Sequence, residues 1–208
     1  MRSRLKSGLI ALALGAGALA PAQAQDPRIG TRLDAPTRAA IFAIVDSARA
    51  QGIPVEPLME KVYEGMGKGA DGPRIVAAVR SLTLEMASAH KALGTVASAE
   101  EIKAAAAAMH AGVPAVELGK MKKQSGLRRS LTLPFTILAD IVSRGVPVTT
   151  AANAIRSLVG AGARDAEINT FQRGVKSDID QGAPPAAAAE TRAKTTSKSP
   201  ESGKPEQL

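Results

Sequence analysis

The amino-acid sequence predicts an all-α protein, either a helical bundle or a short stack of helical hairpins. Composition is the first reason, because aromatic residues make up only 2% of the chain and tryptophan is missing. Strands favour aromatic and β-branched residues, whereas alanine is the best helix former. Apolar residues also recur at three- and four-residue spacing between glycine and proline stops, which is the pattern of amphipathic helices.

An internal match at a constant offset of 93 residues is the second reason. It predicts a three-helix unit used twice, in repeat units at about 34–93 and 127–182 that segment 94–126 joins. Tetratricopeptide repeats are also helical hairpins, but their period of about 34 residues and their signature residues are missing here. The matched pairs are Gly52/Gly145, Pro54/Pro147, Val55/Val148, Gly67/Gly160, Gly69/Gly162, Ala70/Ala163 and Ile75/Ile168.

The first 24 residues have the form of a secretory signal peptide. Three basic residues precede an apolar stretch at 9–20, and a small-x-small cleavage motif ends at Ala24. As a helix, the apolar stretch spans only ~18 Å of a hydrocarbon core that is ~30 Å thick. We therefore expect cleavage near Ala24, an extracytoplasmic (periplasmic or secreted) protein, and no transmembrane segment in the mature chain.

The rest of the chain divides into three parts. Residues 25–33 show no periodicity and are expected to form an extended lead-in. Residues 34–182 have the length of one ordinary domain and are expected to form a single all-α domain. Residues 183–208 offer little to bury, so we expect a disordered tail whose alanines extend the last helix by a turn at most. The chain has no cysteine, so its stability must come from the core.

The first repeat unit predicts three helices. Asp34 is a good N-cap and Pro36 lies in the first turn, which predicts a helix at about 35–51. A second helix is expected at about 56–67, and a glycine-rich turn separates it from a third helix that begins at Pro73. The expected core faces are Ile41, Val45 and Ala48, then Leu58, Val62 and Met66, then Ile75, Val79, Leu82 and Met86.

The joining segment and the second repeat unit predict five more helices. Ser98 and Glu101 have the spacing of a capping box, so a helix starts there, and a short helix follows at about 115–123. In the next helix, at about 131–144, Pro134 either starts the helix or kinks it. The last two helices are expected at about 150–159 and, with Asp165 as N-cap, up to about residue 180. The core faces of these last three helices are Leu131, Phe135, Leu138 and Val142, then Ile155, then Ile168, Phe171, Val175 and Ile179.

A Gly-x-Pro motif follows three of these helices. In each copy the glycine is suited to the left-handed conformation that ends a helix, and the proline prevents the helix from continuing. We therefore interpret these residues as structural turns and predict a positive φ at Gly52 and Gly145. The motif residues are Gly52 and Pro54, Gly112 and Pro114, and Gly145 and Pro147; the copy at Gly112 lacks the glycine-rich exit of the other two.

No residue combination has the spacing of a known catalytic or metal site. His90 and His110 are expected near helix C-termini, where the helix dipole favours a cation. Glu100 and Glu101 are explained by capping. The acidic stripe of Glu56, Glu60 and Glu64 is typical of a solvated face, with cation binding as the alternative. We expect no cofactor.

Five cations within ten residues, with no acid among them, form the strongest charge feature. Without the signal the chain has 24 basic and 19 acidic residues, a net charge of +5 instead of +8. The cluster could contact anionic lipid or polymer, and without aromatic residues it disfavours nucleic acid. The alternative is that these are solvated loop charges. The members of this basic cluster are Lys120, Lys122, Lys123, Arg128 and Arg129.

These observations favour an exported, non-enzymatic helical module that binds a protein or a cell-envelope component. The first alternative is electrostatic binding of an anionic polymer or membrane surface through the basic cluster. The second is an enzyme whose carboxylates are brought together by the fold, which a cleft holding His90 or His110 beside an acid would favour.

Overall fold

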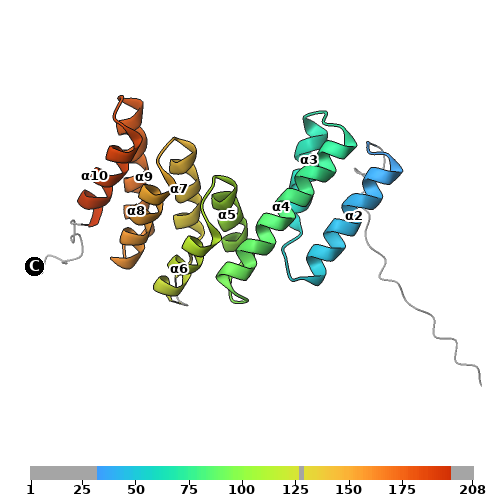
Figure 1. Ribbon diagram of the computed structural model, residues 1–208, viewed down its shortest axis with the longest axis horizontal. Coiled ribbons are helices and arrows are strands. Elements are labelled where there is room, and N and C mark those ends of the chain that lie inside the picture. The colour runs from blue at the N-terminus through green and yellow to red at the C-terminus, as the bar shows by residue number, and fades with distance from the viewer. Residues whose placement is uncertain (1–31, 127–128, 198–208) are drawn as a thin grey trace, which may run out of the picture.

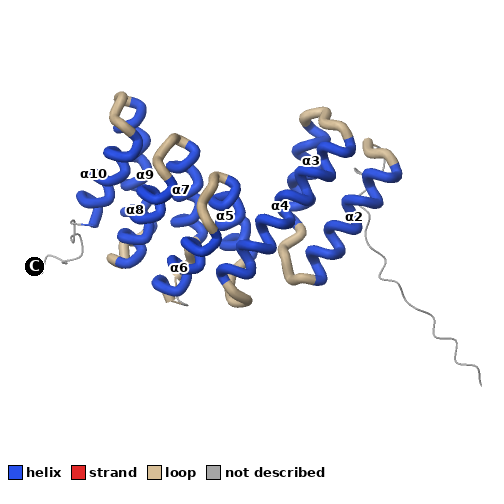
Figure 2. The backbone as a smooth tube through the Cα atoms, in the orientation of Figure 1, coloured by secondary structure: helices blue, strands red, loops and turns tan. Residues whose placement is uncertain are grey.

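The computed structural model describes residues 32–126 and 129–197, which fold into helices and connecting turns without a strand (Figures 1 and 2). The signal peptide, most of the lead-in and Arg128 lie outside the described residues. The helices are α2 (Ala35–Ala50), α3 (Glu56–Gly67), α4 (Gly72–Leu93), α5 (Ala99–His110), α6 (Ala115–Ser125), α7 (Thr132–Ser143), α8 (Val148–Gly160), α9 (Asp165–Asp180) and α10 (Pro185–Ser197). The prediction of an all-α protein is confirmed.

Successive helices run in opposite directions and form an elongated array (Figure 1). On one side of the array α5 packs against α7 and α7 against α9, while α6, α8 and α10 pack in the same order on the other side. The long helix α4 contacts α2 and α3 as well as α5 and α6, so it joins the two ends of the array. This arrangement is a short stack of helical hairpins, the second of the two predicted forms.

One continuous apolar cluster runs through the array. Its largest fully buried side chains include Ile41, Leu58, Met86, Phe135 and Phe171, and helical spacing places each of them on a core face. Among the described residues no buried side-chain nitrogen or oxygen lacks a hydrogen-bond partner. The apolar periodicity therefore identifies the buried faces correctly.

The Gly-x-Pro turns have the predicted backbone conformation. Gly52, Gly112 and Gly145 have φ values of 71°, 101° and 90°, each just after a helix. The residue between glycine and proline is also buried, and its N–H donates to a carbonyl five residues back, for example Ile53 to Ala48 at 3.0 Å. These bonds and this apolar residue define a Schellman motif. The middle position of the motif therefore ties the turn to the core.

Helix starts agree with the sequence to within one residue, except at α8, which begins at Val148, two residues before the expected start at about residue 150. The Asp34 side chain accepts the N–H of Thr37 at 2.9 Å, as an N-cap should. Pro134 lies in the first turn of α7, so it starts that helix instead of kinking it. The N-cap of α9 is Arg164, so the prediction of Asp165 was wrong by one residue. The Asp165 side chain instead adds a negative charge to the first turn, where the helix dipole favours it.

The prediction of a disordered tail from residue 183 was wrong for residues 185–197, which form α10. Ala188, Ala189 and Ala193 are buried against the rest of the array, and Arg192 forms an ion pair with Asp178. Alanine side chains are small, so the apolar pattern gives little sign that this helix can bury a face. Residues 198–208 lie outside the described part of the chain.

The two matched segments have helices with corresponding ends. Helices α2 and α7 end at Ala50 and Ser143, and α3 and α8 end at Gly67 and Gly160, each pair 93 residues apart. In Figure 1 the α2–α3 turn lies at the bottom of the array, whereas the α7–α8 turn lies at the top. These ends are compatible with duplication of a three-helix unit, whose two copies then run in opposite directions.

Candidate functional site

A groove of about 530 Å³ opens between α3, α4 and α5. Helix α4 forms its floor, and α3 and α5, which diverge on either side of α4 in Figure 1, form its walls. Its volume lies within the range of about 300–1,000 Å³ that is usual for binding sites. The lining residues are Pro57, Glu60, Lys61, Glu64, Ala78, Ser81, Leu82, Glu85, Lys103, Ala107 and His110. We call this the α4 groove.

The apolar part of the α4 groove comes from all three helices. Ala78 and Leu82 lie one helical turn apart on α4, so they share a face, and both are only half buried. Pro57 of α3 and Ala107 of α5 complete the apolar lining. The spacing of Leu82 places it on the core face, but it packs against the edge of the core and leaves part of its side chain in the groove.

Ion pairs line the rim of the groove. Glu60 of α3 accepts a hydrogen bond from Lys103 of α5 at 2.6 Å, and these side chains are 62% and 45% exposed. Glu64 accepts hydrogen bonds from Lys61 at 2.6 Å and Lys68 at 2.5 Å, which lower the pKa of Glu64 to about 2. Exposed pairs of this kind stabilise weakly, so the rim charges can exchange partners at little cost.

A histidine and a carboxylate meet at the end of the groove. The Nδ1 atom of His110 lies 3.1 Å from Oε1 of Glu85, with the imidazole 78% exposed and the Glu85 side chain 22% exposed. His110 is the last residue of α5 and His90 lies in the last turn of α4, as the sequence predicted. His90 lies beside the Gly52 turn, away from the α4 groove. Spacing alone gave no sign of the contact, because 25 residues separate its partners.

The described members of the basic cluster do not form one cationic surface. Lys122 points inward, with 11% of its side chain exposed, and pairs with Glu101 at 2.9 Å. Lys120 donates to Glu117 at 2.7 Å, and the Arg129 guanidinium donates to the backbone oxygen of Ala163. Lys123 is exposed. The neutralising carboxylates lie outside the ten-residue window that defined the cluster.

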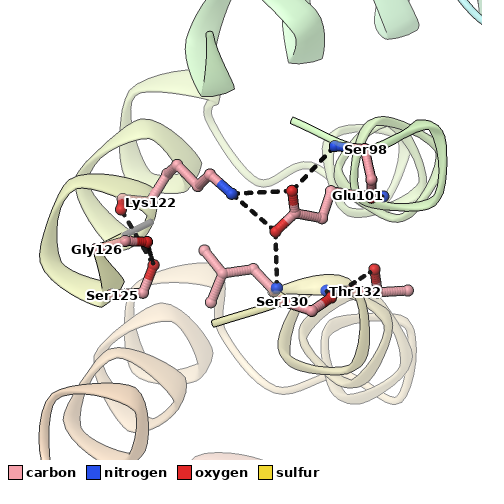
Figure 3. Close-up of polar contacts among 8 residues, drawn as sticks. Ser98, Glu101, Lys122, Ser125, Gly126, Ser130 and Thr132 are labelled. Atoms are coloured by element: carbon pink, nitrogen blue, oxygen red, sulfur yellow. Dashed lines mark hydrogen bonds and ion pairs between the residues drawn. The ribbon is translucent and has the colours of Figure 1, made fainter. Parts of the chain in front are cut away.

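Glu101 joins three helices through a buried carboxylate. Figure 3 shows it between Lys122 of α6 and Ser98, the N-cap of α5. Both of its oxygens lie 2.9 Å from Nζ of Lys122, and it also accepts the N–H of Leu131 at 2.9 Å and that of Ser98 at 3.1 Å. The bond from Ser98, together with the return bond from the N–H of Glu101 to the Ser98 hydroxyl, confirms the predicted capping box.

The hydrogen bonds to Glu101 determine its protonation state. Burial alone raises the pKa of this carboxyl, but hydrogen bonds from Lys122, Leu131 and Ser98 outweigh burial, and the net pKa is lowered. With 5% of its side chain exposed and every lone pair directed at a donor, Glu101 has no free face for a ligand. We therefore assign it to the fold, where it fixes α5, α6 and α7 relative to one another.

Sequence reasoning missed most of the groove. The acidic stripe was recognised, and two of its three members, Glu60 and Glu64, line the α4 groove. Ser81 and Glu85 of α4 and Lys103 and Ala107 of α5 went unnoticed, because residues on exposed faces have no periodic signal. The wall that α5 contributes depends on where α5 lies beside α4, and local sequence does not encode that position.

The comparisons with known proteins add no relative. A scan against protein-family models, a search of curated proteins and a search of solved structures all found no match. Within the described residues no group of three or more acidic or histidine side chains is placed to hold a metal ion. None of the described helices combines the length and the apolar character needed to span a bilayer.

Proposed function

We propose that this protein is an exported, non-enzymatic helical module that binds a partner protein of the cell envelope in the α4 groove. The observation that carries the proposal is the groove itself, an open apolar depression bounded by helices of a stack and ringed by exposed charges. Concave surfaces of stacked helices are common binding surfaces, because many side chains face one partner. The signal-like N-terminus supports export.

The distribution of polar partners also supports binding over chemistry. In the polar cluster around Glu101, the carboxylate oxygens already accept hydrogen bonds from other residues of the fold. The groove in contrast presents apolar side chains at its centre and ion pairs at its rim, which is the usual arrangement of a protein interface. Leu82 is the largest apolar side chain that lines the groove, so it is the most suited to anchor a partner.

A capture experiment with two leucine variants tests this proposal. The mature protein is used as bait in an envelope extract, beside Leu82→Arg and the matched control Leu84→Arg. Leu84 is on the same helix and 66% exposed, and it does not line the groove. We expect a partner that the wild type and Leu84→Arg retain and that Leu82→Arg loses. Equal capture by all three proteins, or the absence of a specific partner, would contradict groove binding.

The contact between His110 and Glu85 favours an enzyme as the second candidate. A histidine held by a carboxylate through one ring nitrogen can use the other as a general base. Among the described residues no nucleophile is hydrogen-bonded to this imidazole, so binding remains the better supported function. A panel of hydrolase substrates tests the enzyme candidate, because turnover must then be lost in His110→Gln.

Binding of an anionic surface through the basic cluster has less support. Lys122 is held by a buried carboxylate, and Lys120 and Arg129 have partners within the protein. The test is binding to vesicles of anionic lipid, in which Lys123→Glu combined with Arg128→Glu should abolish a salt-sensitive interaction if the cluster is used. Unchanged binding would rule the cluster out.

Export is tested directly on the N-terminus. We propose cleavage after Ala24, so the protein recovered from the periplasm or medium should begin at Gln25. Mass determination of the intact protein from each cell fraction checks this, and a protein that keeps residues 1–24 in the cytoplasmic fraction contradicts it.

A further inference from the structure

We infer that the occupant of the α4 groove is a helix of the partner that lies on α3 and α4 as α10 lies on α8 and α9. This inference rests on the proposed function and names the kind of partner. The chain itself provides the comparison, because α8 and α9 match α3 and α4 at an offset of 93 residues and carry a helix on the corresponding face.

The walls of the two sites are matched residue by residue. Four residues of α3 line the groove, and the four residues of α8 at the same offset line a smaller hollow of about 250 Å³ beside α10. The matched pairs are Pro57/Thr150, Glu60/Asn153, Lys61/Ala154 and Glu64/Ser157. The face that is open on α3 is therefore the face that α10 covers on α8.

The floors of the two sites differ in how deeply they are buried. On α9, Phe171 and Val175 are completely buried beneath the neighbouring helices. Their matched residues on α4, Ala78 and Leu82, are half buried and line the groove. Ala78 replaces a phenylalanine, so the groove also has room that a side chain of the occupant can fill.

Charge complementarity specifies part of the occupant. Asp178 of α9 pairs with Arg192 of α10 through two hydrogen bonds, at 2.7 Å and 2.5 Å, and is 20% exposed. Glu85 has the matched position on α4 and a similar exposure of 22%. Its polar partner among the described residues is the exposed imidazole of His110. An arginine from an incoming helix can therefore pair with Glu85 as Arg192 pairs with Asp178.

The occupant should thus carry small residues on one face and an arginine beside them. In α10 the pattern is Ala-Ala-Glu-Thr-Arg-Ala at 188–193, in which the three alanines are buried. A helix laid in a groove through residues three or four positions apart is a common mode of peptide recognition. The α10 of a second copy is a poor candidate, because a short turn holds it against its own α8 and α9.

The test uses a peptide with the sequence of residues 184–197, constrained to a helix by a staple on its exposed face. Its binding to the full-length mature protein is followed by fluorescence anisotropy. We expect saturable one-to-one binding that Glu85→Arg weakens about tenfold, since charge reversal opposes the incoming arginine. A peptide carrying Arg192→Glu should bind Glu85→Arg more tightly than it binds the wild type. Asp180→Arg, at the exposed end of α9, is the matched control and should bind as the wild type does.

Ala78→Phe provides a second variant that needs no change of charge. It places in the groove the residue found at the matched position of α9, where α10 is bound, so the peptide should bind more tightly than to the wild type, with the helical circular dichroism signal kept. No binding, or binding that neither Ala78→Phe nor Glu85→Arg changes, overturns the inference. Self-association that Leu82→Arg abolishes also overturns it, in favour of a second copy.

The two levels of the proposal can fail separately. If Leu82→Arg loses its envelope partner while the helical peptide does not bind, the groove function stands and the helical occupant is wrong. If the peptide binds as expected and no envelope partner depends on Leu82, the groove accepts a helix but the proposed partner class is wrong.

Discussion

The segments α2–α3–α4 and α7–α8–α9 have matching helix ends but finish in different ways. Helix α4 continues to Leu93 and contacts α5 and α6, whereas α9 ends at Asp180 and is covered by α10. The face left open in the first segment is the α4 groove, and the same face in the second segment is closed. The corresponding face of a helical segment is therefore left open or covered, depending on whether its third helix continues or turns back.

A single turn accounts for this difference. Gly182 has a φ of 90° and belongs to a fourth Gly-x-Pro motif with Pro184, which ends α9 and lets α10 fold back. The matched residues of α4 are Ala89 and Lys91, which continue the helix. The extended part of α4 then packs closely on α6, where a Cβ added at Gly119 would lie 3.1 Å from the oxygen of Ala92.

Removal of α10 should leave the second segment with an open face like that of the first. Of the changes considered, it should lower the free energy of unfolding the most. A chain that ends at Gly182 exposes Phe171 and Val175, and each buried apolar side chain of this size contributes about 1.5–3 kcal/mol. We expect the free energy of unfolding in urea to fall by about 3–6 kcal/mol. A chain that ends at Ser197 is the control and should stay within about 0.5 kcal/mol of the full-length protein. Equal stability of both shortened chains would show that α10 does not cover this face.

The two faces of α5 should respond very differently to the loss of a charge. Glu101 pairs with Lys122 in a buried site next to the second segment, so Glu101→Ala should cost about 3–5 kcal/mol of unfolding free energy. Lys103 pairs with Glu60 at the exposed groove rim, so Lys103→Ala should cost less than about 1 kcal/mol. Chemical denaturation of both variants measures the two losses of unfolding free energy and shows whether the loss at Glu101 is the larger. Similar losses would mean that the groove rim is as rigid as the joint around Glu101.

Much of this fold follows from local sequence signals. N-caps, the capping box at Ser98 and the Gly-x-Pro turns define helix ends, and apolar spacing identifies the faces that are buried. Each of these signals depends on residues within one or two helical turns. For this reason α3 was predicted with the bounds that the structure gives.

The errors have two causes, which are an unused local signal and contacts between residues far apart in the sequence. The fourth Gly-x-Pro motif, at Gly182, was a local signal for a further helix that went unused, because the composition after it suggested a tail. In contrast, no local signal pairs Lys122 with Glu101 or His110 with Glu85, because these contacts depend on how whole helices pack. The α4 groove was missed for this same reason.

Replacement of the turn glycines should lower the stability of the protein equally in both segments. The loss should be smaller than that of Glu101→Ala. Gly52 and Gly145 have positive φ values, and an alanine in this conformation costs about 1–2 kcal/mol. Gly67, which ends α3 and has no heavy atom within 4 Å of an added Cβ, is the control. Gly67→Ala should stabilise by up to about 1 kcal/mol through helix propensity. Thermal unfolding checks all three variants, and unequal losses at the two turns would weaken the case for equivalent segments.

The smallest expected difference between the segments is in how their stability depends on acid pH. Glu64 on the groove wall has a pKa of about 2 because Lys61 and Lys68 donate to it, whereas the matched residue of α8 is Ser157, which does not titrate in this range. A carboxyl whose folded pKa lies below its ordinary value of 4.5 stabilises the fold above that value and loses this contribution as the pH falls toward 2. NMR titration should therefore show Glu64 ionised down to about pH 2, and Lys68→Met should raise its pKa. Both partners are solvent-exposed, so salt should reduce the shift. An ordinary pKa at Glu64 would mean that these lysines do not hold the carboxylate, which would leave it free to meet a basic partner in the groove.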